Sequence, residues 1–259
     1  MVHHLRHRLV ASLALVVIAS AVTAGCTGQA GGLGALKASA PTGGPDCHPS
    51  VDPATTHYVI GYGSLMQQAS RTSTAPAATI ALPIEVSGFR RGFIAAGQQP
   101  GFNTVYLGVV PDAQSRFNAV LFDVPASQMT ALDKREGIYC RVAVPASAVT
   151  ILGDQGAAPE GQAWIYVNKA DSLGLPSADI PIIQSYVDIF LSGCLELQDA
   201  NQLTGFADEC VTSTTDWSTH WVNDRIFPRM PQDRQPQAKR IDVLLQQHVP
   251  DEFSAIRIE

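Results

Sequence analysis

Short runs of apolar and β-branched residues recur through the middle of the chain, and most of them end at glycine, proline or a polar cluster. These runs predict strands at 57–62, 84–93, 104–110, 117–124, 139–144 and 162–167. Several of the runs contain glycine, which is typical of curved or closed sheets. The strands are therefore expected to form a curved sheet.

Apolar residues three and four positions apart predict three helices. They cover 125–135, 181–192 and 238–248. Gly137 and Gly193 follow the first two segments and are read as their stop signals. Because strands come first and helices later, without regular alternation, the chain is expected to have an α+β fold and not a doubly wound sheet.

The chain begins with a basic segment and a long uncharged apolar run. Arg6, Arg8 and three histidines precede the run over 9–22. At about 14 residues the run is shorter than the roughly 20 that a permanent membrane-spanning helix needs. The pattern predicts a secretory signal peptide over 1–25.

Small residues lead directly into Cys26. The segment Val22-Thr23-Ala24-Gly25-Cys26 resembles a bacterial lipobox, which implies acylation of the Cys26 thiol and anchoring to the outer face of the cytoplasmic membrane. Ordinary signal cleavage nearby, giving a secreted protein, is the alternative. The following stretch over 26–47 is rich in glycine, alanine and threonine and is expected to be a flexible tether.

Removal of the signal peptide makes the protein more acidic. The whole chain carries 17 basic and 23 acidic residues, and loss of Arg6 and Arg8 changes the net charge from −6 to −8. Such a surface does not attract nucleic acid. The remaining length favours one core, which we place in a domain over 48–210 with a C-terminal extension over 211–259 packed on it.

Besides Cys26 the chain has four cysteines, an even number in a protein sent to an oxidising compartment. Four cysteines allow three disulfide pairings. Because Cys194 and Cys210 enclose a short helical-looking stretch, we favour Cys194 with Cys210 and Cys47 with Cys140; free buried thiols are the alternative. No CxxC or HExxH spacing occurs, so no metal site or cofactor is expected.

The first expected strand leads into the motif Tyr62-Gly63-Ser64-Leu65. Glycine permits a backbone path in which several N–H groups converge, and such a nest binds a carboxylate or a developing oxyanion. A tight turn that binds nothing would have the same sequence. Ser64 is not in a G-x-S-x-G elbow, because Met66 stands where the second glycine would be, so a serine hydrolase is not expected.

The helix expected at 125–135 runs into the motif Leu132-Asp133-Lys134-Arg135-Glu136-Gly137. A carboxylate at a helix C-terminus lies beside carbonyl groups with partial negative charge, and its proton affinity rises further if it turns into a cleft. Such a group suits general acid and base catalysis near neutral pH. A solvated glutamate among other charges is the alternative.

In order and spacing, these two motifs resemble those of the γ-glutamylcyclotransferase family. The resemblance covers about 58–206 and includes the strand that begins Tyr139-Cys140-Arg141-Val142, the late strand Trp164-Ile165-Tyr166 and the helix over 181–193. It implies a small mixed β-barrel flanked by helices. It also implies a reaction in which the α-amine of a γ-glutamyl group attacks its own γ-carbonyl, forming 5-oxoproline and releasing an amine or amino acid.

The resemblance implies a role for each matched residue. Glu136 corresponds to the catalytic glutamate, which would take a proton from the attacking ammonium and give one to the departing amine. The N–H groups of the turn would bind the oxyanion or the substrate α-carboxylate. Tyr62 and Tyr139 would line the pocket, with plain core positions as the alternative. Leu65 stands where several members have asparagine, so the particular γ-glutamyl substrate stays open.

Two other functions remain open from the sequence. The same fold could bind a γ-glutamyl ligand without turnover, although the presence of Glu136 favours an enzyme. The chain could instead be an exported interaction lipoprotein that uses Trp217, Trp221 and Phe227 as a contact patch. Exposure of these rings would support that function, and burial would weaken it.

Overall fold

The computed structural model describes residues 32–99, 101–230 and 237–259. The signal peptide expected over 1–25 and the lipidation site expected at Cys26 lie outside these residues. Among the described residues, no helix combines the length and the apolar character needed to cross a membrane.

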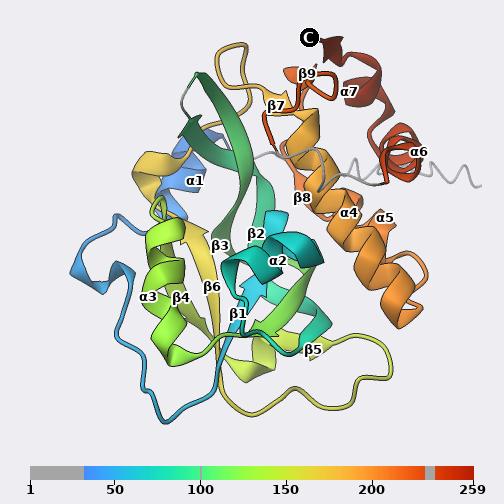
Figure 1. The fold of residues 1–259 in the computed structure, drawn as a ribbon. Coiled ribbons are helices and arrows are strands. Elements are labelled where there is room, and N and C mark those ends of the chain that lie inside the picture. The colour runs from blue at the N-terminus through green and yellow to red at the C-terminus, as the bar shows by residue number, and fades with distance from the viewer. Residues whose placement is uncertain (1–31, 100, 231–236) are drawn as a thin grey trace, which may run out of the picture.

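A curled seven-stranded sheet forms the centre of the molecule (Figure 1). The strand order is β4-β6-β1-β3-β2-β5, and β8 pairs with β2. Strands β1 and β6 are parallel, whereas β1 and β3 are antiparallel. The strands are β1 His57–Gly61, β2 Ala81–Gln99, β3 Phe102–Asp123, β4 Tyr139–Val144, β5 Val149–Ile151, β6 Gln162–Asn168 and β8 Thr214–Thr215. The α+β class is confirmed. The barrel is only partial, because no pairing joins β4 to β5 at the two ends of this order.

Strands β2 and β3 form one long hairpin in place of the three shorter strands expected at 84–93, 104–110 and 117–124. Its pairing register shifts beside Gly88 and again beside Ile94, and such bulges bend a hairpin. The polar residues after Val110 suggested the end of a strand. They lie where β3 is largely exposed, so their polarity reflects contact with solvent and does not mark an end of the strand pairing.

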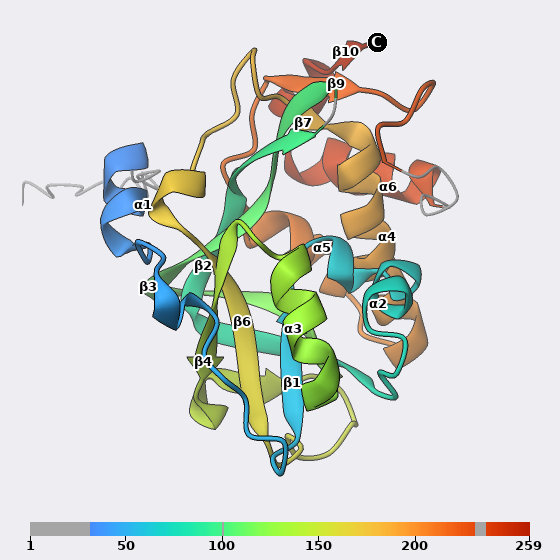
Figure 2. The same cartoon turned by 60° about the vertical axis from the view of Figure 1, so that its left-hand side comes forward.

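Helices cover both sides of the sheet, with α4 and α5 on one side and α3 on another (Figures 1 and 2). The helices are α1 Leu33–Ser39, α2 Gln68–Thr74, α3 Ala126–Arg135, α4 Gln184–Asn201, α5 Phe206–Thr212, α6 Ala238–His248 and α7 Pro250–Ser254. A small parallel sheet joins β7 Ile182–Ile183, β9 Trp221–Asn223 and β10 Arg257–Ile258. The main core lies between the curled sheet and α4, where Phe93 and Phe190 are fully buried.

Helix α4 does not end at Gly193, as the sequence suggested, but continues to Asn201. It stops where Gln202 adopts a left-handed backbone with φ of 55°. Gly193 has a packing role instead. A Cβ atom there would lie 2.2 Å from the backbone of both Met66 and Gln67, so only glycine allows this close approach. Helix α4 therefore supports the backbone that follows the Tyr62 turn.

The N-terminal part of the described chain differs from the flexible tether expected over 26–47. Residues 33–39 form α1, and Leu36 and Ala40 are buried in a cluster with Ile94. The prediction rested on the overall content of glycine, alanine and threonine. It overlooked the apolar positions that let this short helix pack against the hairpin.

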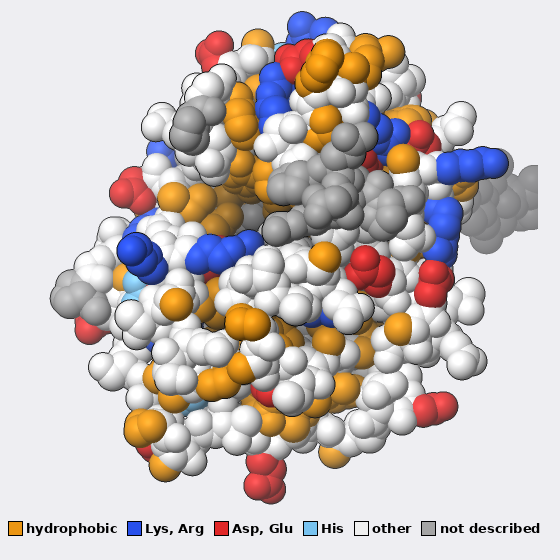
Figure 3. Space-filling view, in the orientation of Figure 1, with side chains coloured by type: hydrophobic (Ala, Val, Ile, Leu, Met, Phe, Trp, Pro, Cys, Tyr) orange, Lys and Arg blue, Asp and Glu red, His pale blue; other side chains and the backbone are white. Residues whose placement is uncertain are grey.

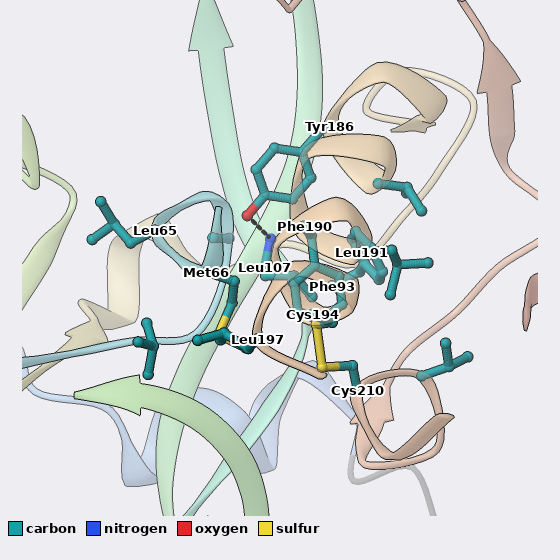
Figure 4. Close-up of a cluster of buried hydrophobic side chains, with 14 of the residues drawn as sticks. Leu65, Met66, Phe93, Leu107, Tyr186, Phe190, Leu191, Cys194, Leu197 and Cys210 are labelled. Atoms are coloured by element: carbon teal, nitrogen blue, oxygen red, sulfur yellow. Dashed lines mark hydrogen bonds between the residues drawn. A yellow bond between two sulfur atoms is a disulfide. The ribbon is translucent and has the colours of Figure 1, made fainter. Parts of the chain in front are cut away.

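Both disulfide bonds have the pairing that we favoured from the sequence. Cys47 is bonded to Cys140 at the start of β4, and Cys194 in α4 is bonded to Cys210 in α5 (Figure 4). The first bond joins residues 93 positions apart. In the chain-entropy model a loop of that size stabilises the fold by about 4–5 kcal/mol. It also holds the N-terminal segment against the strand that carries Tyr139.

The C-terminal extension packs on the domain through its aromatic residues. Trp221 is fully buried, and Trp217 is half-buried between it and Phe93, with ring centroids 5.2 Å and 4.7 Å away. Phe227 is 83% exposed. Two of the three rings considered for an exposed contact patch therefore serve the core, which weakens the interaction function proposed from sequence.

Candidate functional site

A pocket of about 730 Å³ lies where the turn after β1, the end of α3 and the tip of the β2–β3 hairpin meet. Figure 3 shows a hollow on this face that is lined by hydrophobic side chains and has basic side chains at its rim. The residues predicted for catalysis and substrate binding all line this one pocket: Tyr62, Gly63, Ser64, Leu65, Glu136 and Tyr139.

The turn after β1 lines the pocket and has backbone donors without an acceptor inside the turn. Ser64, Leu65 and Met66 form a short 3-10 turn, whose first hydrogen bond runs from the Met66 N–H to the Gly63 carbonyl at 2.9 Å. The N–H groups of Ser64 and Leu65 precede that bond and have no acceptor within the turn. A Cβ at Gly63 would lie 2.7 Å from the Tyr186 hydroxyl, so a larger residue here would displace the Tyr186 side chain.

Glu136 caps the C-terminal end of α3. Its N–H donates to the Leu132 carbonyl at 2.9 Å, and its side chain is only 13% exposed. Burial raises the pKa of the Glu136 carboxyl, and the charge and hydrogen bond of Arg135 lower it. Because the Glu136 side chain is mostly buried and lines the pocket, its carboxyl faces the pocket and not bulk water.

Arg135 joins the carboxylate to the turn. Its Nη1 forms an ion pair with Glu136 Oε1, and its Nη2 donates to Ser64 Oγ at 3.4 Å. One guanidinium thus spans the distance between two segments that lie about 70 positions apart in the sequence. This role could not be predicted from the sequence, because a residue adjacent to Glu136 carries no spacing signal of its own.

Asp133 fixes the end of α3 against the sheet. Its carboxylate accepts hydrogen bonds from Arg141 Nε at 2.8 Å and from the Tyr166 hydroxyl at 2.6 Å. The Tyr166 carbonyl in turn accepts the Tyr62 hydroxyl at 2.7 Å. This network ties together the segment that carries Glu136 and the strand end that carries Tyr62.

The pocket tyrosines act as walls. The Tyr139 hydroxyl donates to the Leu107 carbonyl at 3.2 Å, and the Leu107 N–H donates to the Tyr186 hydroxyl at 3.2 Å (Figure 4). Burial raises the pKa of Tyr62 and Tyr139 well above the ordinary value, and also raises that of Tyr186. These phenols stay protonated at neutral pH and shape the pocket. Tyr62 and Tyr139 are thus core residues and pocket residues at once.

The C-terminal extension also reaches the pocket, through Arg229 and Met230. The sequence predicted no chemical role for this extension, because the extension lies beyond the residues that carry the resemblance. Nothing local in the sequence indicates that the two residues fold back onto a turn near position 63.

Among the described residues, no cluster of three or more histidine, cysteine or acidic side chains could hold a metal ion.

No protein-family model and no curated protein matches the chain. The chain is similar to a solved structure described as a gamma-glutamyl cyclotransferase, with 13% identity and a TM-score of 0.49 over 73% of this chain and 99% of that one. It is also similar to an uncharacterized protein from Homo sapiens, with 13% identity and a TM-score of 0.47 over 72% and 98% of the two chains. A glutathione-specific gamma glutamyl cyclotransferase from yeast is 14% identical, with a TM-score of 0.38 over 60% of this chain and 96% of that one.

Proposed function

We propose that this chain is a γ-glutamylcyclotransferase-like enzyme that converts a small γ-glutamyl compound into 5-oxoproline and a free amine or amino acid. One observation carries the proposal: the buried carboxyl of Glu136 shares a pocket with the Tyr62–Leu65 turn, and Arg135 contacts both. The paired sequence motifs point to the same chemistry.

The reaction needs one proton carrier. The substrate α-amine attacks the γ-carbonyl, a new C–N bond closes the ring, and the C–N bond to the leaving amine breaks. The attacking nitrogen gives up a proton and the leaving nitrogen gains one, so Glu136 accepts the first and supplies the second. Burial, which raises the pKa of Glu136, brings its proton affinity closer to what a carrier at neutral pH requires.

The turn and the tyrosines meet the remaining requirements of the reaction. The N–H groups of Ser64 and Leu65 can donate to the γ-oxygen as it gains negative charge, or to the substrate α-carboxylate. The buried walls formed by Tyr62 and Tyr139 hold a flexible five-atom chain in a folded pose, which reduces the entropy that cyclisation must lose.

The direct test is to incubate the purified protein with a panel of γ-glutamyl amines and γ-glutamyl amino acids and to measure 5-oxoproline. Product from any member of the panel supports an enzyme. If every compound is left intact while one or more of them binds, the pocket belongs to a binding protein that does not catalyse the reaction.

Replacing Arg135 by methionine is expected to move the acid limb of the kcat/KM profile to higher pH. Arg135 lowers the pKa of Glu136 and burial raises it, so removing the guanidinium leaves the effect of burial unopposed. The reaction starts from the carboxylate form, and a higher pKa leaves less of that form at acid pH. Initial rates of 5-oxoproline formation between pH 5 and 9 would measure the shift.

Arg116→Met serves as the control for this pH profile, because Arg116 is largely exposed, pairs with Glu85 and does not line the pocket. Its acid limb should coincide with that of the unaltered protein. An acid limb that does not move in Arg135→Met would contradict Glu136 as the base.

We also propose that the protein is exported and held on the outer face of the cytoplasmic membrane by lipid on Cys26. The support is the N-terminal sequence pattern together with two disulfide bonds, which fit an oxidising compartment. Cys26→Ser should move the protein from the membrane fraction to the soluble fraction, because the acylated thiol is lost. Unchanged fractionation would contradict the anchor.

A further inference from the structure

Among its described residues, the C-terminal extension contributes one charged side chain to the pocket, that of Arg229. Its guanidinium lies over the ring of Phe102, 5.5 Å from the ring centroid, and its Nη2 contacts Glu259 Oε2. Its Nη1 is buried and has no hydrogen-bond partner among the residues that the structure describes. A buried donor without an acceptor costs free energy, so this position favours a ligand that supplies one.

The backbone of Arg229 is fixed to the helix that forms part of the pocket. Asp224 is buried and accepts hydrogen bonds from the Ser185 N–H at 2.7 Å and the Ser185 hydroxyl at 2.6 Å. The same carboxylate accepts the Arg229 N–H at 2.9 Å. Ser185 precedes Tyr186, whose ring lines the pocket. Arg229 is therefore held in place before a ligand binds, which reduces the entropy lost on binding.

The charges around the pocket indicate what kind of ligand fits. In the part of the chain that the structure describes, the charged residues that line the pocket are Lys134, Arg135, Glu136 and Arg229. Arg135 is paired with Glu136, which leaves two cations for the ligand. The contact of Arg229 with Glu259 offsets little of its charge, because the Glu259 side chain is 49% exposed and surface pairs are weak. Two cations suit a ligand with two carboxylates.

We infer that Arg229 is a specificity-determining residue that binds the carboxylate of a leaving amino acid. This inference rests on the proposed function, because it assumes that the γ-glutamyl group occupies the space beside Glu136 and Ser64. The leaving group then extends toward Phe102 and Arg229 in the same pocket. A γ-glutamyl amino acid has two carboxylates and a γ-glutamyl amine has one, so γ-glutamyl amino acids are the preferred substrates.

A matched pair of compounds tests the inference. γ-Glutamyl-alanine and γ-glutamyl-ethylamide differ only in the carboxylate of the leaving group. We expect kcat/KM to be roughly tenfold to 100-fold higher for the alanine compound. Arg229→Gln should reduce that preference to a few-fold, mainly through KM for the alanine compound, and Arg229→Lys should retain part of it. Equal turnover of the two compounds, or an equal loss on both in Arg229→Gln, would overturn the inference.

Glu259→Gln tests whether the charge of Arg229 or the packing of the C-terminal segment sets the substrate preference. This change removes the surface partner of Arg229, leaves its guanidinium in place and alters no residue of the pocket lining. The preference for the alanine compound should persist in Glu259→Gln. If it falls as far as in Arg229→Gln, the packing of the segment and not the charge sets the preference, and the inference is wrong.

Calorimetry measures binding without turnover, so it tests the inference separately from the proposed reaction. In Glu136→Gln protein, γ-glutamyl-alanine should bind more tightly than the ethylamide, and adding Arg229→Gln should remove most of the difference. That result supports the carboxylate site even if the unaltered protein forms no 5-oxoproline, in which case only the proposed reaction fails. Equal binding of both compounds, or binding of neither, overturns the inference.

Discussion

Glu136→Gln should lower kcat/KM for 5-oxoproline formation by a factor of roughly 10²–10⁴ and leave the fold intact. An amide of the same size fills the space of the carboxyl but cannot take a proton from the substrate ammonium. The side chain is mostly buried and caps α3 through its backbone, so the substitution disturbs neither the helix end nor the pocket wall. Initial rates and a thermal unfolding curve on the same sample would measure both effects.

Glu160→Gln is the matched control for this experiment, because Glu160 is exposed in a loop and does not line the pocket. Its rate should equal that of the unaltered protein. If Glu136→Gln forms 5-oxoproline as fast as the unaltered protein, Glu136 is not the proton carrier, even though the fold would still be correct. A reduced rate at an unchanged unfolding temperature would locate the effect in the chemistry.

Elements that depend on local sequence could be predicted closely. The strand expected at 139–144 and the helix expected at 238–248 have the bounds found in β4 and α6. In both, the periodicity of apolar residues and the flanking residues carry the whole signal, and tertiary contacts do not override it. The site motifs at 62–65 and 132–137 were also local, and the structure brings them into one pocket.

Features set by contacts between distant segments could not be predicted. Gly193 resembled a helix stop, but its role is to let α4 approach the backbone at Met66, more than 120 positions away. The bridge that Arg135 makes to Ser64 and the position of Arg229 in the pocket depend on tertiary folding in the same way. A single sequence gives the chemistry of such residues but not what they contact.

Arg91→Met should destabilise the fold by about 3–5 kcal/mol. Arg91 is fully buried, and burial lowers its pKa to about 9, so it remains a cation at neutral pH. It forms no ion pair among the described residues, and its charge is stabilised by oxygen acceptors from the sheet, the Tyr62 turn and the end of α5. They are the carbonyls of Tyr62, Asn118 and Cys210 and the side chains of Asn118, Ser213 and Thr214.

These acceptors decide whether replacing Arg91 stabilises or destabilises the fold. Replacing a buried charge by an apolar side chain can be neutral or stabilising when the partner groups are removed with it. Here the partners stay behind, buried and deprived of a donor. Chemical unfolding of Arg91→Met should show the loss, with Arg91→Lys intermediate and the exposed Arg116→Met within about 0.5 kcal/mol of the unaltered protein. A loss below about 1 kcal/mol would mean that water replaces the guanidinium and that Arg91 does not hold the Tyr62 turn.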